Sequence, residues 1–538
     1  MSNHLYYGDN LDVLRNEIGD ETVDLIYLDP PFNSNASYNV LFKGPTGRDS
    51  AAQIEAFDDT WHWGEAAEAA YRDVLHSGSD AGEMLRAMRA FLGDNDMMAY
   101  LAMMAVRMLE LHRVLKPTGS LYLHCDPTAS HYLKILLDAV FGARRFGAEI
   151  IWKRTSAHSD AGQGRRLLGY QHDVIFQYMK SDNYTWNTQY HAYDQSYIDK
   201  HYRHVEEGTG RRFGSFDITA PGGSDPKKRN PHYEFLGVTR YWRFSRERME
   251  KLYAEGRIFQ SKPGVVPRQK RYLDEMPGTP LQDIWLDIAP LTAQAAERLG
   301  YPTQKPVALL ERILAASSNA GDVVLDPFCG CGTTVHAAQK MGRRWIGIDV
   351  THLAIGLIEK RLRDAFSGIE FDTHGTPQDL SGARDLAHRG RVDPRYYHEF
   401  EKWALSLVDA KPTKRSGDGG IDGNLYFGKP ERRAIVEVKS GKVGTPQVAR
   451  LRGALERHGA DIGVFLSLEE PNKGMRAEAA AAGHVEIDGF APVPRLQLVT
   501  VEQAMALRDR AIRLPLSRDD APKARREEDA TRQGRLDL

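Results

Sequence analysis

The feature that most constrains the fold is a short apolar run that leads directly into a glycine-rich turn. Val323-Val324-Leu325 is followed by Asp326-Pro327, and the turn Phe328-Cys329-Gly330-Cys331-Gly332 precedes a stretch typical of a helix. An apolar run of this kind fits a strand buried on both faces, which requires a parallel sheet covered by helices. Glycine lacks a Cβ and tolerates positive φ, so the turn lets a ligand approach the backbone closely. The sequence therefore predicts an α/β fold with a ligand site at the end of this strand.

The same alternation of strand and helix occurs on both sides of a long, less regular central region. We expect strands at residues 22–28, 120–124, 322–326 and 344–349, and helices at residues 100–115, 306–317, 333–341 and up to about 366. Helices between short apolar strands indicate βαβ units. A separate α/β unit is expected at residues 393–505.

Composition excludes several classes of protein. Hydrophobic residues make up 41% and charged residues 27% of the 538 residues, which excludes a mainly disordered chain. Three cysteines, Cys125, Cys329 and Cys331, cannot supply a disulfide framework and fit a reducing compartment. No apolar stretch reaches about 18 residues, and the first residues lack the layout of a signal peptide. We therefore expect a cytoplasmic protein without a membrane segment.

The net charge of −2 hides an uneven distribution of charge. Residues 227–271 carry 13 Lys and Arg against four Glu, a local net charge of +9. Five aromatic residues interleave with these charges: Tyr233, Phe235, Tyr241, Trp242 and Phe244. A solvated surface is the ordinary explanation of a charge run. Because cations neutralise phosphates while rings stack on bases, the mixture favours a nucleic-acid contact.

An acid at the end of the strand after the glycine turn suits a nucleoside-containing ligand. Asp349 lies 23 residues after Asp326, a distance suited to holding ribose hydroxyls. The turn lacks the Gly-x-Gly-x-x-Gly pattern, and no Lys-Ser/Thr follows it, so neither a dinucleotide fold nor a P-loop fits. Cys329 and Cys331 have no second pair of thiols, and they fit small turn residues better than zinc ligands.

A second turn, Asp29-Pro30-Pro31-Phe32, follows the first expected strand. Two prolines at a strand end fix a rigid turn and hold the neighbouring carbonyls and carboxylate in place. A flat ring with an exocyclic amine could stack on Phe32, while Asp29 and a proline carbonyl accept its hydrogen bonds. These bonds would make the amine nitrogen a better nucleophile. An ordinary strand-ending turn is the alternative.

Residues 5–365 resemble the DNA amino-methyltransferases, which transfer a methyl group from S-adenosylmethionine to adenine-N6 or cytosine-N4. The motifs that carry the resemblance are Asp29–Phe32, Asp326–Gly332, Tyr301–Pro306, Gly321-Asp322, Tyr7–Asn10 and Glu149–Lys153. The catalytic motif precedes the cofactor motif, which is the β arrangement of this family, with a recognition region between them.

The resemblance implies a Rossmann-like methyltransferase sheet and a role for each matching residue. Asp29 and Phe32 would bind the flipped base, and the carbonyl of Pro30 or Pro31 would polarise its amine. The resemblance also implies which residues hold S-adenosylmethionine. Its methionine part would contact Asp326, Phe328, Gly330 and Gly332. Its ribose would contact Asp349 and its adenine amine Asp9, while Lys305 would line the same pocket. Asp before Pro-Pro favours adenine over cytosine. The implied partner is double-stranded DNA with a flipped target base.

Residues 393–505 contain a second group of charged residues. Asp422 ends a glycine-rich loop, and Glu437 and Lys439 alternate with valines in the next strand, so they share a face. A hairpin can bring Asp422 close to Glu437, and the two carboxylates can then bind Mg²⁺. Lys439 can orient water against a phosphodiester. The alternative is a solvated Glu-Lys pair on a surface strand.

This segment resembles the Mrr-like branch of the PD-(D/E)xK restriction endonucleases. The matching parts are Tyr397–Glu401, Gly417–Gly423, Glu437-Val438-Lys439, residues 463–468 and residues 477–483. The resemblance implies that Asp422, Glu437 and Lys439 carry cleavage, with Glu401 as a further member.

These inferences predict a single-chain restriction–modification enzyme. Its expected parts are a methyltransferase catalytic part (1–154), a target-recognition region (155–287), a cofactor-binding part (288–366), a linker (367–392), a nuclease domain (393–505) and a charged, disordered tail (506–538). Alternatively, the C-terminal domain only binds DNA or is inactive, or the chain is a modification subunit whose restriction partner supplies an ATPase. A homodimer is also left open. The recognition sequence cannot be read from the residues.

Overall fold

The structure, a computed structural model, divides the chain into two compact units. The described residues are 2–31, 37–43, 49–58, 62–155, 168–169, 171–220, 223, 229–292, 295–299, 301, 303–392, 398–413, 421–428, 432–487, 489–516, 518 and 524–527. The first unit combines Met1–Asn187 with Asp283–Leu538, and the second is Thr188–Gln282.

A nine-stranded sheet of described residues forms the framework of the first unit. Its order is β16 (Ile284–Trp285), β6 (Phe146–Lys153), β7 (His172–Met179), β5 (Leu115–Cys125), β2 (Val23–Leu28), β17 (Val323–Asp326), β18 (Arg344–Asp349), β1 (His4–Tyr7) and β19 (Asp372–His374). All neighbouring strands are parallel except β7, which runs antiparallel to β5 and β6. The predicted α/β sheet is therefore confirmed.

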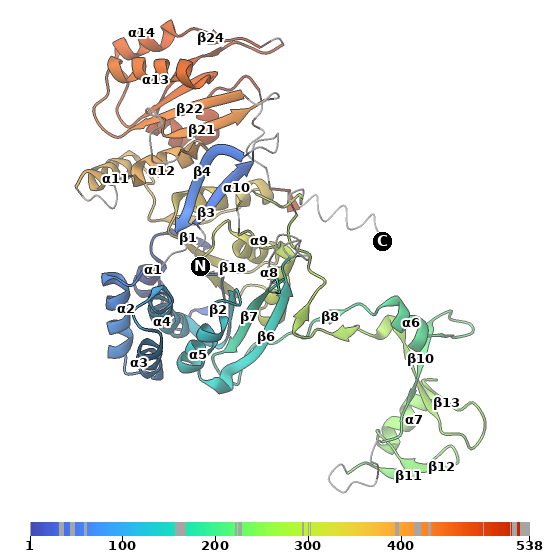
Figure 1. The fold of residues 1–538 in the computed structure, drawn as a ribbon. Coiled ribbons are helices and arrows are strands. Elements are labelled where there is room, and N and C mark those ends of the chain that lie inside the picture. The colour runs from blue at the N-terminus through green and yellow to red at the C-terminus, as the bar shows by residue number, and fades with distance from the viewer. Residues whose placement is uncertain are drawn as a thin grey trace. The chain divides into compact units, whose positions relative to one another are not determined.

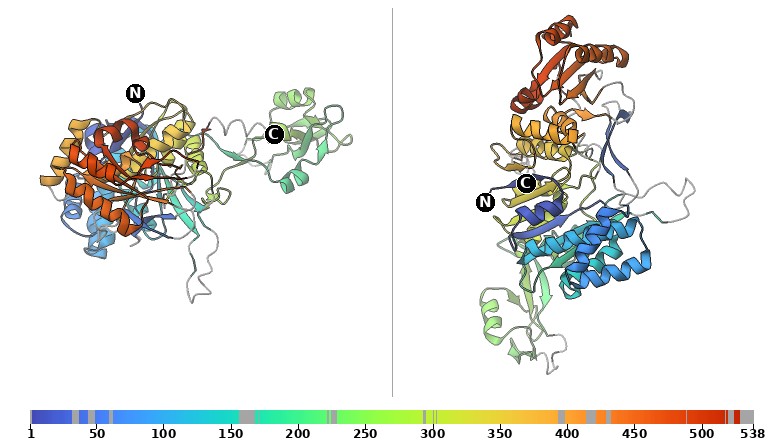
Figure 2. Two further views of the ribbon diagram at one scale, coloured as in Figure 1. Left: turned by 90° about the horizontal axis from the view of Figure 1, so that it is seen from above. Right: turned by 90° about the vertical axis from the view of Figure 1, so that its left-hand side faces the viewer.

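Helices cover the sheet because its central strands are apolar on both faces. Every residue of β17 is buried, as are five of the six residues of β2. The first group of helices contains α1 (Asn10–Glu17), α2 (Glu65–His76), α3 (Asp80–Leu92), α4 (Asp96–Val114) and α5 (Ser130–Phe141). Figures 1 and 2 show α2 to α5 gathered side by side, in agreement with their mutual contacts. The second group, α8 (Val307–Ser317), α9 (Thr333–Lys340) and α10 (His352–Ala365), packs near β17, β18 and β1.

The predicted Asp326–Gly332 turn and Asp29-Pro30-Pro31 turn lie side by side because β2 and β17 are adjacent strands. Val324 pairs with Leu25 and Leu325 pairs with Ile26, so the two strands end together. In parallel sheets, ligands bind at the carboxyl ends of the strands. A two-stranded hairpin, β3 (Ser37–Lys43) and β4 (Asp49–Asp58), follows β2 in the chain.

The C-terminal part of the first unit contains a five-stranded sheet of described residues. Its order is β20 (Lys411–Pro412), β21 (Gly423–Phe427), β22 (Arg432–Lys439), β23 (Ile462–Ser467) and β26 (Leu496–Thr500). The apolar cores hold α11 (Leu380–Val392), α12 (Glu399–Leu407) and α15 (Val501–Leu507) with Val436 and Val438, and α13 (Thr445–His458) and α14 (Lys473–Ala481) with Ile435. Figure 1 labels β21, β22, α13 and α14 in this part. A short pair, β24 (His484–Val485) and β25 (Val493–Pro494), completes it.

Three expected boundaries differ from the structure. Residues 367–392, expected as a linker, contain β19, which pairs with β1, and α11, which buries Ala383, Leu386 and Ala387. The nuclease boundary at 505 falls inside α15, and Ile512 beyond it is buried in the same core. The expected recognition region included β7, which instead belongs to the main sheet. β19 is a short, polar strand at the sheet edge, so it lacks the apolar period that marks the central strands.

The second unit has its own sheets and core. Its elements are β8 (Tyr190–His191), α6 (Gln195–His201), β9 (His204–Val205), β10 (Arg212–Asp217), β11 (His232–Phe235), β12 (Val238–Tyr241), α7 (Arg246–Ala254), β13 (Ile258–Phe259), β14 (Arg268–Tyr272) and β15 (Thr279–Pro280). The strands form one sheet in the order β13-β14-β10-β9 and the pairs β11-β12 and β15-β8.

Two of the five aromatic residues between the basic residues of this unit have a different role from the predicted one. Trp242 is fully buried and Phe235 is buried beside it, with Met249 and Leu252 of α7. Both rings form the core of the unit, so they cannot stack on bases. The basic residues Arg240, Arg243 and Arg248 are exposed, as the charge argument requires.

Among the helices in the described part of the chain, none has the length and apolar character needed to cross a membrane.

Candidate active sites

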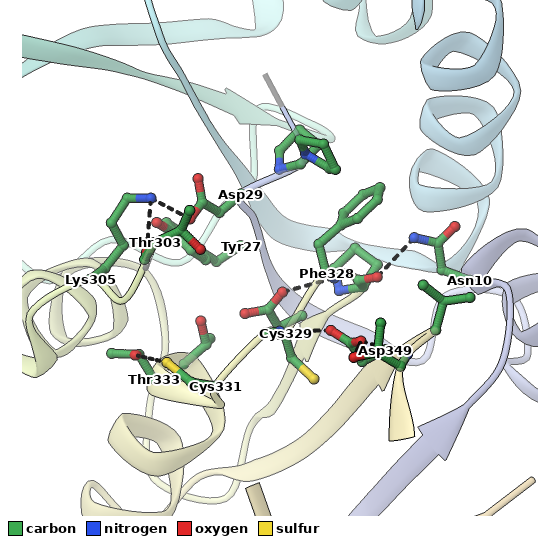
Figure 3. Close-up of a pocket in the computed structure, with 18 of the residues that line it drawn as sticks. Asn10, Tyr27, Asp29, Thr303, Lys305, Phe328, Cys329, Cys331, Thr333 and Asp349 are labelled. Carbon is green, nitrogen blue, oxygen red and sulfur yellow. Dashed lines mark hydrogen bonds and ion pairs between the residues drawn. The ribbon is translucent and has the colours of Figure 1, made fainter. Parts of the chain in front are cut away.

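A cavity of about 320 Å³ opens where β2, β17 and β18 end. Residues of both predicted turns line it, as do Asp9 and Lys305. Figure 3 shows Lys305 pointing towards Asp29 with Tyr27 beside them, and Phe328 and Asp349 along the same cavity. Six of the seven predicted cofactor residues, Asp9, Lys305, Asp326, Phe328, Gly330 and Asp349, line this space. A volume of this size suits a small ligand rather than water alone.

The glycine turn requires glycine at two positions. Gly330 has φ +51°, and its amide donates a 2.9 Å hydrogen bond to Asp349 Oδ2. Gly332, the predicted cofactor residue outside the cavity lining, has φ +74° at the start of α9. A Cβ there would lie 2.8 Å from Ile358 Cγ1, which is closer than side chains pack. Gly332 therefore sets the approach of α9 to α10, and its contact with the cofactor stays a prediction.

Two carboxylates, of the buried Asp326 and the half-buried Asp349, lie in the cavity wall. Asp326 accepts a hydrogen bond from the Phe328 amide (3.0 Å), and burial raises its pKa to about 7. Asp349 accepts from the amides of Gly330 and Thr351, which oppose the effect of burial, and its pKa is raised to about 6. A raised carboxylate pKa means that the surrounding protein stabilises the ionised form poorly, so a cationic ligand would be favoured.

Asp29 and Lys305 form the ion pair that closes one side of the cavity. Lys305 Nζ donates to Asp29 Oδ2, although the two residues are far apart in sequence. The other oxygen, Asp29 Oδ1, is buried and accepts no hydrogen bond from the described residues. Pro30 and Pro31 line the same cavity. Phe32, the predicted stacking ring, lies outside the described residues.

Arg107, which sequence reasoning missed, fixes the part of the cavity around Asp9. This buried arginine of α4 donates from Nη2 to both oxygens of Asp9 (2.8 and 3.0 Å) and from Nε to Asn10 Oδ1 (2.6 Å). Asn10 in turn donates to the Pro327 carbonyl (2.8 Å). Asp9 also caps α1 by accepting from the Leu11 amide. A single arginine inside the apolar run of α4 was the signal that could have revealed it.

The second predicted group of residues is brought together by the β21–β22 hairpin. Gly423 pairs with Val436, so Asp422 reaches the middle of β22, where its Oδ2 accepts from the Val438 amide (2.6 Å). Lys439 Nζ lies 3.0 Å from Glu437 Oε1 and 3.7 Å from Asp422 Oδ2. One ammonium therefore lies within reach of both carboxylates, which is where a bound cation would be stabilised. Residues 417–420 of the predicted loop lie outside the described residues.

Burial raises the pKa of all three acids at this second site. For Asp422 and Glu437 the nearby Lys439 charge partly offsets this effect. Glu401, the predicted further member, has its pKa raised by burial and by the negative charge of Asp422. His398 Nδ1 lies 3.4 Å from Glu401 Oε2 and joins the same group. A cluster of acids that resist ionisation together is a suitable ligand set for a divalent cation.

Comparison with known proteins matches a family to each of the two parts of the chain that carry these sites. Residues 23–360 match the DNA methylase family and residues 397–489 match a restriction endonuclease family. The Type II methyltransferase M.EcaI of Enterobacter cloacae is 33% identical over 267 residues, covering 49% of this chain and 57% of its own length. The Mod subunit of the Type III restriction-modification enzyme StyLTI of Salmonella typhimurium is 27% identical over 360 residues, which cover 62% of this chain and 49% of its own length.

A solved structure with S-adenosyl-L-methionine, TTHA0409 of Thermus thermophilus, is described as a DNA modification methylase. It is 16% identical, with a TM-score of 0.33 over 69% of this chain and 97% of that one, which is too low to support an argument. This chain spans about half the length of the two curated relatives that it matches.

The fold and the cavity define a methyltransferase-type α/β domain joined to a restriction-endonuclease-like domain. The chain belongs to the DNA methylase family, because the family match covers more than half of it. The resemblance to both families that the sequence motifs indicated is confirmed.

The glycine turn yields a stability prediction with a matched control. Gly342 has a similar φ of +70°, but a Cβ there would meet nothing within 4 Å. Gly342→Ala should therefore lower the free energy of unfolding only by the cost of a left-handed backbone, about 1–2 kcal/mol. Gly332→Ala adds an overlap with Ile358 worth about 1–3 kcal/mol more. Urea unfolding of both variants checks this, and equal losses would show that Gly332 is not constrained by α10.

Proposed function

We propose that the chain transfers a methyl group from S-adenosyl-L-methionine to an exocyclic amine of a DNA base, adenine-N6 in preference to cytosine-N4. The observation that carries this proposal is Asp29 Oδ1, a buried carboxylate oxygen at the cavity without a hydrogen-bond partner among the described residues. A buried acceptor of this kind costs free energy unless a ligand donates to it. An exocyclic amine of a flipped base is such a donor.

The cavity fits the cofactor by the chemistry of its walls. Asp326 and Asp349 offer two carboxylates with raised pKa values, which suit a ligand that carries both positive charge and ribose hydroxyls. When bound, S-adenosyl-L-methionine supplies an electrophilic methyl group on a positively charged sulfur. Gly330 gives the backbone close access, and Asp349 and Asp326 would hold the ribose and the methionine part, respectively. Asp9, fixed by Arg107, would accept from the adenine amine.

The residues of the catalytic turn act by position and hydrogen bonding. Asp29 Oδ1 would accept from the target amine while Lys305 holds Oδ2, so the carboxylate cannot rotate away. The Pro30 or Pro31 carbonyl would accept the second amine hydrogen, and this pair of bonds keeps the nitrogen lone pair directed at the methyl group. Because the two reactants are already held in line when bound, the loss of their translational entropy does not add to the barrier of the transfer step. No covalent enzyme intermediate is needed.

The second site supports a Mg²⁺-dependent phosphodiesterase activity on DNA. Asp422 and Glu437 share one cation, the Lys439 ammonium, in the present arrangement. Mg²⁺ prefers carboxylate oxygens and keeps several waters. When bound there, Mg²⁺ would polarise a phosphate oxygen and lower the pKa of a water. Lys439 would then turn towards the phosphate. Together the two activities would make this a restriction–modification enzyme, and the exposed arginines of the second unit would contact the DNA backbone.

Asp29→Asn tests the methyltransferase assignment. The amide cannot hold the same charge-assisted bonds, so we expect kcat for DNA methylation to fall by at least about 100-fold. The Kd of S-adenosyl-L-methionine should change by less than about threefold, since Asp29 contacts the base. Asp24→Asn is the matched control: Asp24 lies on β2, the strand that leads into Asp29, and pairs with Lys116 at 2.8 Å outside the cavity. Full activity of Asp29→Asn would contradict the assignment.

Cofactor binding should depend on pH through Asp326 and Asp349. Their pKa values are raised to about 7 and about 6, so the ionised forms that favour a cationic ligand are lost as the pH falls. We expect the affinity to drop about tenfold from about pH 8 to about pH 6, with proton release on binding near neutral pH. Calorimetry in buffers of different ionisation enthalpy measures both effects, and Asp326→Asn should flatten the profile. A constant Kd over this range would contradict the role of these acids.

Cleavage by the second site should require Mg²⁺, the carboxylates and Lys439. Asp422→Asn and Lys439→Met should each reduce the nicking of plasmid DNA by at least about 100-fold. Glu478→Gln, which removes a 3.2 Å surface ion pair with Arg452 in the same domain, serves as the control. Because burial raises the pKa of Asp422 and Glu437, the Mg²⁺ requirement should rise as the pH falls. Absence of cleavage by the unaltered protein would favour a DNA-binding module.

A further inference from the structure

A chain of buried polar groups starts at the cavity wall and leads away from it. Tyr27, which lines the cavity, has its Oη 2.8 Å from His124 Nδ1. His124 Nε2 lies 3.0 Å from Asp173 Oδ2, and Asp173 Oδ1 lies 3.3 Å from Nη1 of Arg154. Tyr27, His124 and Asp173 are exposed by 2%, 0% and 1%, respectively, whereas Arg154 reaches the surface. The methyl-transfer geometry described above uses none of these groups.

The strand order places these four residues in a row on one face of the sheet. Tyr27 is on β2, His124 on β5, Asp173 on β7, and Arg154 directly follows β6, and these are four successive strands. Tyr27 pairs with Tyr122, two residues before His124, and Asp173 pairs with Trp152, two residues before Arg154. Since side chains alternate along a strand, each step keeps the same face. Asp29 lies just beyond the end of β2 and lines the same cavity as Tyr27 (Figure 3).

The chemistry of the three groups decides which way each hydrogen bond runs. An ionised carboxylate only accepts, so Nε2 of His124 donates to Asp173. Nδ1 of the neutral imidazole is then an acceptor, and the hydroxyl of Tyr27 donates to it. The ring is thus held in the tautomer that can take up a proton on the side facing Tyr27 and the cavity.

Asp173 places a negative charge beside the buried ring of His124. Burial alone would raise the pKa of Asp173, but the hydrogen bond and charge of His124, with the charges of Lys305 and Arg154, lower it below its ordinary value. Asp173 therefore remains a buried anion. A merely structural contact between these strands would be met as well by apolar residues, because burying a charge is costly.

We propose that Tyr27, His124 and Asp173 take up the proton that the target amine releases during methyl transfer. This proposal rests on the proposed methyltransferase function. As the nitrogen–carbon bond forms, the carbon–sulfur bond breaks and its electron pair goes to sulfur, which leaves the nitrogen with one proton too many. That proton moves to Asp29. Asp29 passes it to the oxygen of Tyr27 while the original hydroxyl proton of Tyr27 moves to His124 Nδ1.

The end state balances in protons and charge. Tyr27 is again a neutral phenol, Asp29 is again a carboxylate, and His124 is an imidazolium paired with the Asp173 anion. Burial and the charge of Asp29 raise the pKa of Tyr27 well above its ordinary value, so Tyr27 relays the proton and does not hold a charge. Tyr27 passes the proton on, and Asp173 is a positioning residue that acts through His124.

Several charged groups surround this row and would shape its titration. Asp29 and Lys305 face it from the cavity, Arg154 from the end of β6, and Asp126 from the end of β5. The Trp152 ring packs edge-on against His124 at 5.8 Å between centroids and shields the ring from water. Any pH dependence of the transfer step is therefore a property of the group as a whole.

Tyr27→Phe against Tyr122→Phe tests the proposal. Tyr122 is the partner of Tyr27 in register, is equally buried, and hydrogen-bonds to Ser317 (2.6 Å) and Gln177 (2.9 Å) away from the cavity. Single-turnover methylation of a target oligonucleotide should slow about 10- to 100-fold in Tyr27→Phe, with loss of the pH dependence and of the solvent deuterium isotope effect. Tyr122→Phe should keep the rate and the profile of the unaltered protein. An unchanged rate in Tyr27→Phe, or equal slowing in both, would overturn the proposal.

His124→Gly provides a second test that a loss of stability cannot imitate. Free imidazole at millimolar concentration should restore the lost single-turnover rate by at least about tenfold, and more so at higher pH, because only neutral imidazole accepts the proton. No rescue in a folded variant that binds the cofactor normally would overturn the proposal. A failure of the methyltransferase function is distinguishable, because the unaltered protein would then transfer no methyl group at all.

Discussion

The ion pair between Lys305 and Asp29 is the interaction on which the first site depends. Asp29 directly follows β2 and Lys305 lies just before α8, so the pair joins two segments that are 276 residues apart in the sequence. The lysine occupies one carboxylate oxygen and leaves the other buried and without a hydrogen-bond partner among the described residues. Without this pair, Asp29 could turn towards solvent, and the cavity would have no oriented acceptor.

The acids at the cavity lower the stability of the fold, because their negative charges are poorly solvated. Asp326 and Asp349 are carboxylates whose pKa values are raised by burial, so the protein alone stabilises their negative charge poorly. A cationic cofactor would relieve this cost, so binding and protonation are coupled. The second site repeats the principle, since Asp422, Glu437 and Glu401 are all acids with raised pKa values beside a single lysine.

The sequence predicts the central strands, both turns and the acid–lysine group, because each depends on local patterns. A buried apolar run, a proline pair and alternating residues in a strand carry their own signal within about ten residues. Arg107 gave no motif, since it is one arginine in an apolar helix. The row from Tyr27 to Arg154 could not be found either, because its members are joined only by the order of the strands. The prediction for Trp242 was wrong because its basic neighbours suggested a ring at the surface. In the structure this ring packs in the apolar core of the second unit.

The central claim is that Asp29 Oδ1 receives the target amine while Lys305 holds Oδ2. The most direct measurement is a crystal structure of the protein with a non-reactive cofactor analogue and a target oligonucleotide. The account predicts a flipped base whose exocyclic nitrogen lies about 3 Å from Asp29 Oδ1, with the Lys305 pair intact. A flipped base bound with its amine directed elsewhere, and Asp29 Oδ1 still without a partner, would contradict it.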